Sequence, residues 1–212
     1  METRDQWAFS GWVPAWLPFA HGRSTVKRTR RRADVTDAFL AGGVEKRELF
    51  LVEYDPAWAD VYSTHEARVR SAIGDLAEAV EHIGSTSVPG LAAKPIIDVL
   101  VTVPDITAEE EYLEPLVAVG YVLRVREPGH RLVRTEQRDV HIHILEPDDR
   151  AADDYLLLRD HLRVDSDDRH LYEATKRDLM TREWSDMNAY ADAKTSVIEE
   201  IKERARSSRP TS

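Results

Sequence analysis

The chain has 212 residues, enough for one domain with an additional helical segment, and its hydrophobic content of 42% is ample for a buried core. Its formal net charge of -10 argues against a protein that binds polynucleotides or anionic membranes through a broad basic surface, although a local basic pocket is compatible with that charge. The absence of cysteine excludes disulfides, cysteine-ligated zinc and thiol nucleophiles, and no apolar run reaches the roughly 18–20 residues that span a bilayer, so we expect a cytoplasmic protein.

Residues 1–43 differ in composition from the rest of the chain. Scattered aromatic residues precede a basic cluster at residues 27–32. Because no sustained periodicity is visible, we interpret residues 1–43 as a disordered basic leader. A basic arm for RNA or acidic partners is one alternative, and an extension upstream of a later start near Val35 is another. The folded domain is expected over residues 44–206, with a frayed tail at residues 207–212.

Six short segments have the length and the apolar or β-branched content of strands. They lie at residues 49–52, 81–83, 95–103, 121–125, 131–135 and 139–145. The run at 95–103 is nearly continuous in apolar residues, which fits a strand buried on both faces.

Helical periodicity marks the segments between and after these strands. The expected helices lie at residues 58–80, 107–119, 154–163, 168–182 and 184–206. Thr107 precedes Glu110 by three residues, which is a capping-box pattern, and Gly120 is well placed to end that helix.

The turn Gly84-Ser85-Thr86-Ser87 is the candidate phosphate site. Glycine lets backbone N–H groups approach an anion, and the three hydroxyls can donate hydrogen bonds to phosphate oxygens. An ordinary loop is the alternative, because the turn lacks the Gly-Lys-Ser/Thr sequence of a P-loop. Lys94 would add positive charge to the same site.

Asp98 lies inside an apolar strand, where an ionised carboxylate is costly unless a metal ion, a lysine or a strand-end position compensates its charge. A salt-bridged residue at a strand end is the alternative to a functional one. The turn and Asp98 together have the layout of a nucleotidyltransferase site, in which a turn holds phosphates and a strand presents a carboxylate to a metal. Leu100 occupies the position where such sites carry a second acid.

His141 and His143 share one strand face with Asp139, because side chains alternate between the two faces of a strand. The apolar residues between them are expected to face the core, so both histidines should point toward a cleft or toward solvent. A His-x-His strand suits zinc and other transition metals, and imidazole also suits a proton shuttle near neutral pH. Paired surface histidines without a function are the alternative.

Several polar residues in the second half of the chain could in principle reach a ligand. The cations are Arg131, Arg134 and Arg159, and the tyrosine–lysine pairs at i, i+4 spacing are Tyr172/Lys176 and Tyr190/Lys194. We interpret the arginines as surface charge and the pairs as helix-stabilising contacts, so none of them is assigned to the site.

The segment from Glu81 to Asp98 resembles the GrpB family of the nucleotidyltransferase superfamily. Further matching segments are residues 54–58, 141–143 and 158–163, together with Tyr172, Lys176, Tyr190 and Lys194, so the resemblance covers roughly residues 44–203. It implies a nucleotidyltransferase-like α/β (α+β) fold, with a small mixed β-sheet flanked by helices and a C-terminal helical segment. Some actinobacterial dephospho-CoA kinases carry a similar domain, which suggests a link to coenzyme A metabolism.

These observations predict a protein that binds a nucleotide or another phosphorylated small molecule. The expected phosphate-binding residues are Gly84, Ser85, Thr86, Ser87 and Lys94. The expected ligands of a divalent ion (Mg²⁺, Mn²⁺ or Zn²⁺) are Asp98, His141 and His143.

The reaction class stays open between an enzyme and a binding domain. An enzyme would carry out metal-dependent nucleotidyl or phosphoryl transfer, with Asp98 as metal ligand, His143 as base and Asp139 in the position of a third acid. Leu100 favours the alternative, a catalytically inactive nucleotide-binding or regulatory domain. A metallohydrolase that uses His141 and His143 is a third hypothesis.

Overall fold

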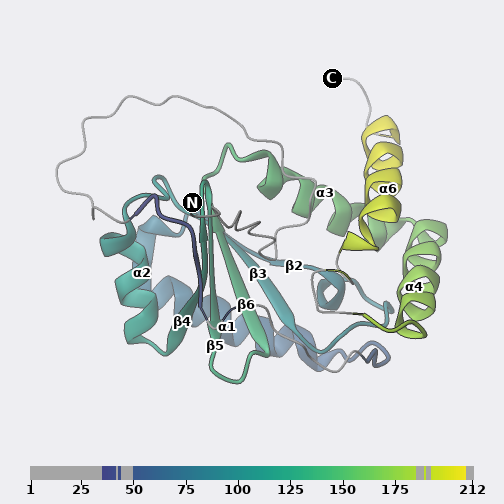
Figure 1. Ribbon diagram of the computed structural model, residues 1–212, viewed down its shortest axis with the longest axis horizontal. Coiled ribbons are helices and arrows are strands. Elements are labelled where there is room, and N and C mark those ends of the chain that lie inside the picture. The colour runs from purple at the N-terminus through teal and green to yellow at the C-terminus, as the bar shows by residue number, and fades with distance from the viewer. Residues whose placement is uncertain (1–34, 42, 44–49, 185–188, 190–191, 209–212) are drawn as a thin grey trace, which may run out of the picture.

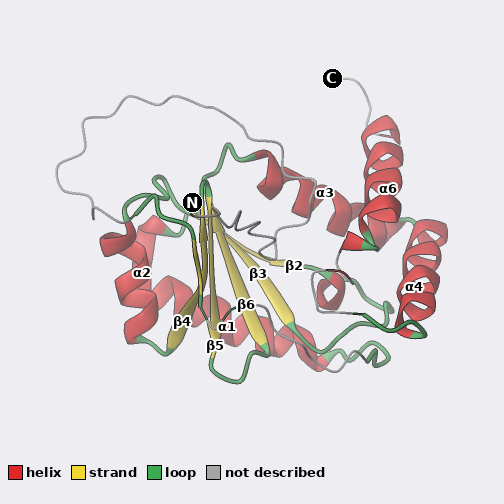
Figure 2. Cartoon of the chain, viewed as in Figure 1, coloured by secondary structure: helices red, strands yellow, loops and turns green. Residues whose placement is uncertain are grey.

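The computed structural model describes residues 35–41, 43, 50–184, 189 and 192–208. These residues form one six-stranded sheet flanked by helices (Figure 1), and Figure 2 shows the same view by secondary structure. The strands are β1 (Phe39–Leu40), β2 (Ala79–Ile83), β3 (Ile97–Thr102), β4 (Tyr121–Glu127), β5 (His130–Thr135) and β6 (Val140–Leu145). The helices are α1 (Ala57–Ile73), α2 (Glu109–Ala118), α3 (Arg150–Val164), α4 (Ser166–Met180) and α6 (Thr195–Ser208). Every helix among the described residues is too short or too polar to cross a membrane.

The central strands β3 and β6 run parallel, and all other neighbouring strands pair antiparallel in the order β1-β4-β5-β6-β3-β2. This arrangement confirms the predicted small mixed sheet flanked by helices, with a helical C-terminal segment. In the β3–β6 register Asp98 lies beside His141, and Leu100 lies beside His143. Because directly paired residues point to the same face of a sheet, Asp98 and both histidines share one face.

Side-chain alternation divides the core between the two faces of the sheet. Val99 and Val101 of β3 pack with Ile142 and Ile144 of β6 against α1 and α2. On the opposite face Leu100 packs in an apolar cluster with the first residues of α3. A further cluster joins α3, α4 and α6 beside the loop that precedes β3. The face that carries Asp98 is therefore the face that the C-terminal helices cover.

The helix predicted from Trp58 to about Val80 is too long. α1 ends at Ile73, and Gly74 follows with φ 55°, a left-handed conformation that favours glycine. Val80 belongs instead to β2, where it pairs with Val101. Leu76, the other apolar residue of the predicted stripe after Gly74, lies in a short 3-10 turn at Gly74–Leu76.

The predicted capping box does not form at the start of α2. The N-cap position is Ala108, and the Thr107 hydroxyl donates a hydrogen bond to Asp105 Oδ1 at 2.7 Å. The backbone N–H of Thr107 donates to the same oxygen, so Asp105 closes a local turn ahead of the helix. Gly120 follows the end of α2 as predicted.

The last predicted helix, at residues 184–206, is interrupted. The chain turns at Ala193 and Lys194, and α6 begins only at Thr195. Residues 185–188 and 190–191 lie outside the described residues. α6 continues to Ser208, so it includes two residues that we expected in the tail, and residues 209–212 lie outside the described residues.

Part of the segment expected as leader belongs to the sheet. Phe39 and Leu40 form β1, which pairs with the edge of β4, and Val35 is buried. The Arg131 guanidinium donates a hydrogen bond to the Val35 carbonyl at 2.7 Å. Residues 1–34 lie outside the described residues, as does Leu49 of the expected strand at 49–52, in which Val52 forms a single bridge with Ala93.

A buried ionic cluster fastens α2 to the sheet. Glu109, in the first turn of α2, is fully buried and accepts hydrogen bonds from Arg126 at 2.7 Å and from Arg131 at 2.5 Å. Arg131 also donates to the backbone carbonyls of Glu127 and His130. Arg131, which we interpreted as surface charge, is therefore a structural residue of the core.

Candidate functional site

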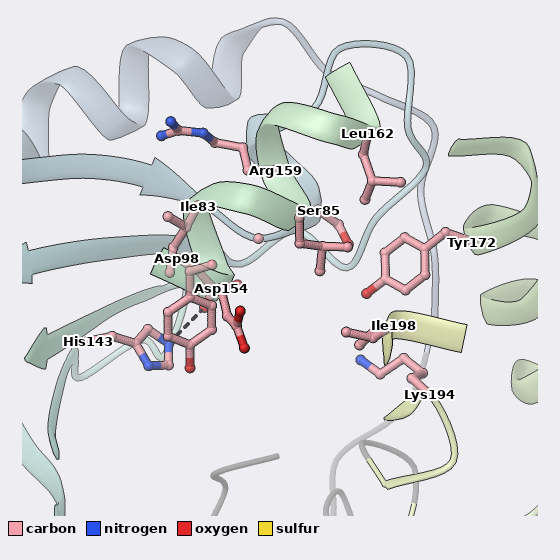
Figure 3. Close-up of a pocket in the computed structure, with 13 residues that line it drawn as sticks. Ile83, Ser85, Asp98, His143, Asp154, Arg159, Leu162, Tyr172, Lys194 and Ile198 are labelled. Atoms are coloured by element: carbon pink, nitrogen blue, oxygen red, sulfur yellow. Dashed lines mark ion pairs between the residues drawn. The ribbon is translucent and has the colours of Figure 1, made fainter. Parts of the chain in front are cut away.

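A pocket lies between the end of the sheet and the helices α3, α4 and α6 (Figure 3). Its lining residues are Ile83, Gly84, Ser85, Asp98, His143, Asp154, Tyr155, Leu158, Arg159, Leu162, Tyr172, Lys194 and Ile198. Its cavity of about 150 Å³ is smaller than the roughly 300–1,000 Å³ of pockets for drug-sized ligands. The pocket therefore suits one end of a nucleotide-sized ligand rather than the whole of it.

The turn after β2 presses directly against Asp98. Gly84 has φ 71° and ψ -175°, a combination that is essentially restricted to glycine. A Cβ atom at this position would stand 2.5 Å from Asp98 Oδ2. Glycine is thus required both by the backbone conformation and by the close approach of the carboxylate.

Only one of the three hydroxyls of the turn faces the pocket. The Thr86 hydroxyl donates to the Ile96 carbonyl at 3.1 Å, and the Ser87 hydroxyl donates to the Gly84 carbonyl at 2.6 Å. Both side chains are buried and hold the turn in shape. Ser85 lines the pocket, and its Oγ accepts a hydrogen bond from Lys176 Nζ at 3.1 Å.

Asp98 lies between the two histidines of β6. Its Oδ1 atom is 3.6 Å from His141 Nδ1 and 3.6 Å from His143 Nε2, which is too long for a hydrogen bond. Burial by itself would raise the pKa of Asp98, but His143, His141 and Lys194 outweigh that effect and hold the pKa below its usual value. The carboxylate is therefore kept ionised in a covered position.

Both histidines are buried, with exposed fractions of 7% for His141 and 1% for His143. They face the covered side of the sheet rather than solvent, and the tilted ring of Tyr155 on α3 lies 5.4 Å from the His143 ring. Asp139, the tentative third acid, is exposed and accepts a hydrogen bond from the Thr135 hydroxyl. It is not among the residues that line the pocket.

Lys194, just before α6, lines the pocket, whereas neither Lys176 nor Lys94 is among the lining residues. Lys176 of α4 is buried, and its Nζ also donates to the Ala92 carbonyl at 2.5 Å. Burial, with a smaller contribution from Lys194, lowers the pKa of Lys176 to about 7. Burial lowers the pKa of Lys194 to about 8, against the attraction of Asp98. The i, i+4 spacing predicts only helix-stabilising roles for both lysines, and the family resemblance is the sequence signal that points to them.

The remaining charged groups of the pocket are neutralised by neighbouring residues. Arg159 of α3 binds Glu81 of β2 at 2.6 Å and Asp160 at 2.7 Å, which ties the helix to the sheet. Asp154 accepts a hydrogen bond from Lys202 of α6 at 3.0 Å. These pairs fix the walls of the pocket.

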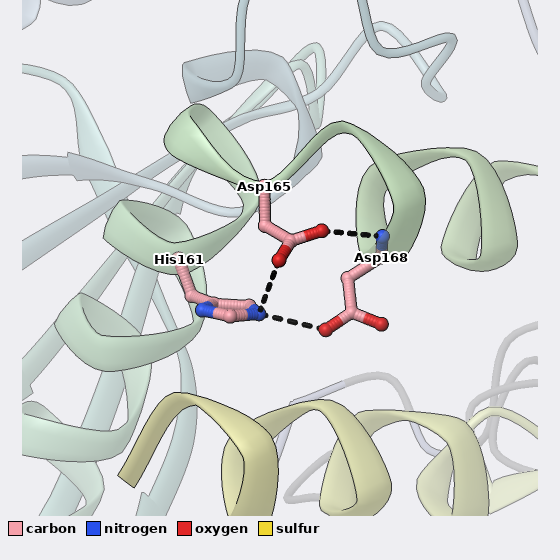
Figure 4. A group of neighbouring side chains, drawn as sticks. All are labelled: His161, Asp165 and Asp168. Carbon is pink, nitrogen blue, oxygen red and sulfur yellow. Dashed lines mark hydrogen bonds and ion pairs between the residues drawn. The ribbon is translucent and has the colours of Figure 1, made fainter. Parts of the chain in front are cut away.

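One group of three acidic and histidine side chains has ligand atoms that all lie within 4.8 Å of one another among the described residues. It consists of His161, Asp165 and Asp168 at the corner between α3 and α4 (Figure 4). Asp168 already accepts hydrogen bonds from His161 at 2.7 Å and from Arg204 at 2.7 Å, and Asp165 caps α4. This cluster joins three helices and is a structural corner.

The predicted metal trio does not form such a group. Asp98 Oδ1 lies at a suitable distance from each histidine, but Asp98, His141 and His143 do not all lie within 4.8 Å of one another. Ligands of one tetrahedral ion stand about 2.0–2.2 Å from it and hence close to each other.

Comparison with known proteins settles the family. The family model described as GrpB protein matches residues 48–204, which include every residue of the pocket. The chain belongs to the GrpB family. A UPF0157 protein of Streptomyces coelicolor is 58% identical over 180 residues, covering 85% of this chain and 96% of that protein.

This chain is also similar to a solved structure and to a longer protein. The crystal structure of the conserved protein GrpB from Enterococcus faecalis is 30% identical with a TM-score of 0.65, and the match covers 74% of this chain and 96% of that chain. A dephospho-CoA kinase of Mycolicibacterium paratuberculosis is 30% identical over 223 residues, covering 92% of this chain and 51% of the kinase. The GrpB region therefore also occurs as about half of a longer protein.

Proposed function

We propose that this protein binds a nucleotide or another phosphorylated small molecule, with the phosphate held between Ser85, Lys176 and Lys194. The observation that carries the proposal is the approach of these two lysines, from separate helical segments, to the Gly84–Ser85 turn beside the buried Asp98. Ser85 and Lys194 line the pocket together with apolar side chains, and Lys176 adjoins the pocket through its hydrogen bond to Ser85. That composition is typical of a small-molecule site.

The energetics of the lysines support an anionic ligand. Lys176 and Lys194 repel each other, and burial disfavours their charged forms. A phosphate between them would place negative charge beside both amines. Its oxygens would accept hydrogen bonds from each amine. Charge-assisted contacts of this kind are among the stronger hydrogen bonds in proteins.

A divalent ion would have fewer protein ligands at this site than the sequence predicts. Asp98 Oδ1 is buried and makes no hydrogen bond to the described residues, and His143 Nε2 is 3.6 Å away. Asp98 with His143 would hold an ion beside the phosphate. Such an ion would neutralise phosphate charge and lower the pKa of a bound hydroxyl.

Binding without two-metal transfer is the function that the geometry supports best. Leu100, at the position of a second acid, packs in the apolar cluster under α3, and Asp139 is exposed outside the pocket. The site thus offers one carboxylate where two-metal chemistry needs more. The similarity to a dephospho-CoA kinase supports dephospho-CoA and ATP as the first ligands to test.

Ligand-induced stabilisation tests the proposal. ATP, dephospho-CoA or inorganic phosphate is expected to raise the Tm of the full chain, and Mg²⁺, Mn²⁺ or Zn²⁺ is expected to increase the effect of at least one of them. Lys194→Met is expected to weaken that ligand by roughly 10- to 150-fold, because a hydrogen bond to a charged group contributes about 1.5–3 kcal/mol.

Lys94→Met is the matched control, since Lys94 lies outside the pocket lining. It should bind as the wild type does, when Kd is measured by titration calorimetry. If Lys94→Met loses affinity while Lys194→Met keeps it, the phosphate position proposed above is wrong.

The affinity for a phosphate ligand is expected to fall as pH rises through about 7. The pKa of Lys176 in the ligand-free protein is about 7, against an ordinary value of 10.5, so the amine loses its charge in this range. A bound anion favours the charged amine, so binding takes up a proton and weakens at higher pH. The Kd measured in a pH series should show this rise, and Lys176→Met should flatten it.

The stability of the ligand-free protein should respond to pH in the opposite sense. Between about 7 and 10.5 the unfolded chain keeps the proton on Lys176 that the folded chain has lost. Because the unfolded state then binds more protons, the contribution of Lys176 to the free energy of unfolding rises with pH.

For the binding prediction, a Kd that falls from neutral to alkaline pH would contradict the role of Lys176 in holding the phosphate.

A further inference from the structure

Helix α4 holds the segment before β3 by both polar backbone groups of Ala92. The Ala92 N–H donates a hydrogen bond to Glu173 Oε2 at 3.0 Å, and the Ala92 carbonyl accepts one from Lys176 Nζ at 2.5 Å. Glu173 and Lys176 are three residues apart, so they lie on the same face of α4. Because Ala92 is fully buried, both of its backbone groups need partners within the protein, and α4 supplies both.

The next residue, Ala93, is held by a different part of the chain. Its N–H donates to the Val52 carbonyl at 3.0 Å, and the Val52 N–H donates to the Ala93 carbonyl at 2.9 Å. Ala92 and Ala93 are therefore fixed by four hydrogen bonds, two of which come from side chains of α4. The Ala92 carbonyl is thus a fixed acceptor for Lys176 Nζ.

Lys176 connects this clamp to the pocket. Its Nζ also donates to Ser85 Oγ at 3.1 Å, and it lies over the Tyr172 ring, 4.8 Å from the ring centroid. An ammonium group has three N–H bonds, and the hydrogen bonds to Ala92 and Ser85 use two of them. With two N–H bonds directed at fixed acceptors, the direction of the third is fixed as well. The clamp therefore determines how Lys176 meets a ligand beside Ser85.

Glu173 also acts on Lys176 through its charge. Burial has the largest effect and lowers the pKa of Lys176 to about 7, Lys194 and Arg177 lower it further, and Glu173 opposes them. Arg177 holds the Glu173 carboxylate with a hydrogen bond of 2.9 Å and binds the exposed Glu53 at 2.7 Å. Glu173 thus contributes both the place of the Ala92 peptide and a negative charge near the amine.

We propose that Glu173 is a positioning residue for the phosphate-binding amine: it holds Ala92 in the place from which the Ala92 carbonyl fixes Lys176 Nζ beside Ser85. Its carboxylate also favours the charged form of that amine. The role rests on the proposed function, in which Lys176 holds an anion. Glu173 is not among the residues that line the pocket, so it acts on a ligand through Lys176.

A lysine NMR titration of the ligand-free full chain tests the effect of the charge. The carbon signal next to the amine is followed with pH in lysine-labelled protein, and Lys176→Met identifies the signal of Lys176. Glu173→Gln keeps an acceptor for the Ala92 N–H but removes the charge. The titration midpoint of Lys176 should therefore fall, by at least roughly twofold in proton affinity. Glu53→Gln removes an exposed carboxylate from the same Arg177 and should leave the midpoint unchanged.

Glu173→Met tests the effect of position, because it removes both the charge and the acceptor for Ala92. The Kd of inorganic phosphate is measured by titration calorimetry at about pH 6, below the pKa of Lys176 of about 7, so that the amine is charged. Glu173→Gln should bind within about twofold of the wild type, and Glu173→Met should bind about 10-fold more weakly.

Two results would overturn the role of Glu173. One is an unchanged midpoint of Lys176 in Glu173→Gln, and the other is a Glu173→Met variant that binds phosphate as tightly as Glu173→Gln does. A wild-type protein that binds no phosphate ligand would instead refute the proposed function. The ligand-free titration would then still decide whether Glu173 acts on Lys176.

Discussion

Glu109→Gln is expected to lower the free energy of unfolding by about 3–5 kcal/mol, because it removes a buried carboxylate that pairs with two buried guanidiniums. The side chains of Arg126 and Arg131 are almost completely buried, so both lose a carboxylate partner where water cannot replace it. Glu109 also stands in the first turn of α2, where a negative charge interacts favourably with the helix dipole. A loss of this size is a large part of the about 5–15 kcal/mol that typical domains possess.

Urea unfolding followed by circular dichroism measures this effect. Glu114→Gln is the matched control, because it removes an exposed carboxylate from the same helix. The control should change the free energy of unfolding by no more than about 0.5 kcal/mol, as surface substitutions usually do. If Glu109→Gln changes the free energy of unfolding as little as the control does, the buried ionic cluster does not stabilise the fold as its burial implies.

Gly84→Ala is expected to abolish ligand-induced stabilisation. The added Cβ would stand 2.5 Å from Asp98 Oδ2, so either the turn or the carboxylate must move. The backbone conformation at Gly84 adds a strain of about 1–3 kcal/mol for any residue with a side chain. Because Ser85 and Asp98 belong to the pocket, a shift of either one disturbs the site directly.

Gly90→Ala separates the effect of backbone strain from the effect of contact with Asp98. Gly90 also has a positive φ, of 78°, but a Cβ there meets no atom within 4 Å. We expect this variant to lose about 1–2 kcal/mol of stability through backbone strain and to keep its ligand response. Thermal shifts with the ligand found for the wild type make the comparison. Equal ligand responses in the two variants would show that contact between Gly84 and Asp98 does not matter for the site.

The sequence by itself determined the elements that depend on local spacing. The apolar alternation of β4, β5 and β6 and the continuous run of β3 predicted those strands within a few residues. The family segment predicted that the Gly84 turn and Asp98 share a site, because the turn and the strand are close in sequence. Pairing of Ile83 with Asp98 at the end of β2 and β3 then brings them together.

The tertiary structure alone decided which cations reach the pocket. Lys94 is close to Asp98 in sequence, yet the lysine bonded to Ser85 is 91 residues away, because α4 folds back over the turn. Asp98 of β3 likewise meets His141 and His143 because β6 lies beside β3, although β4 and β5 separate these strands in the chain. Local patterns determine the period and the face of an element, whereas contacts between distant elements are set by how the whole core packs.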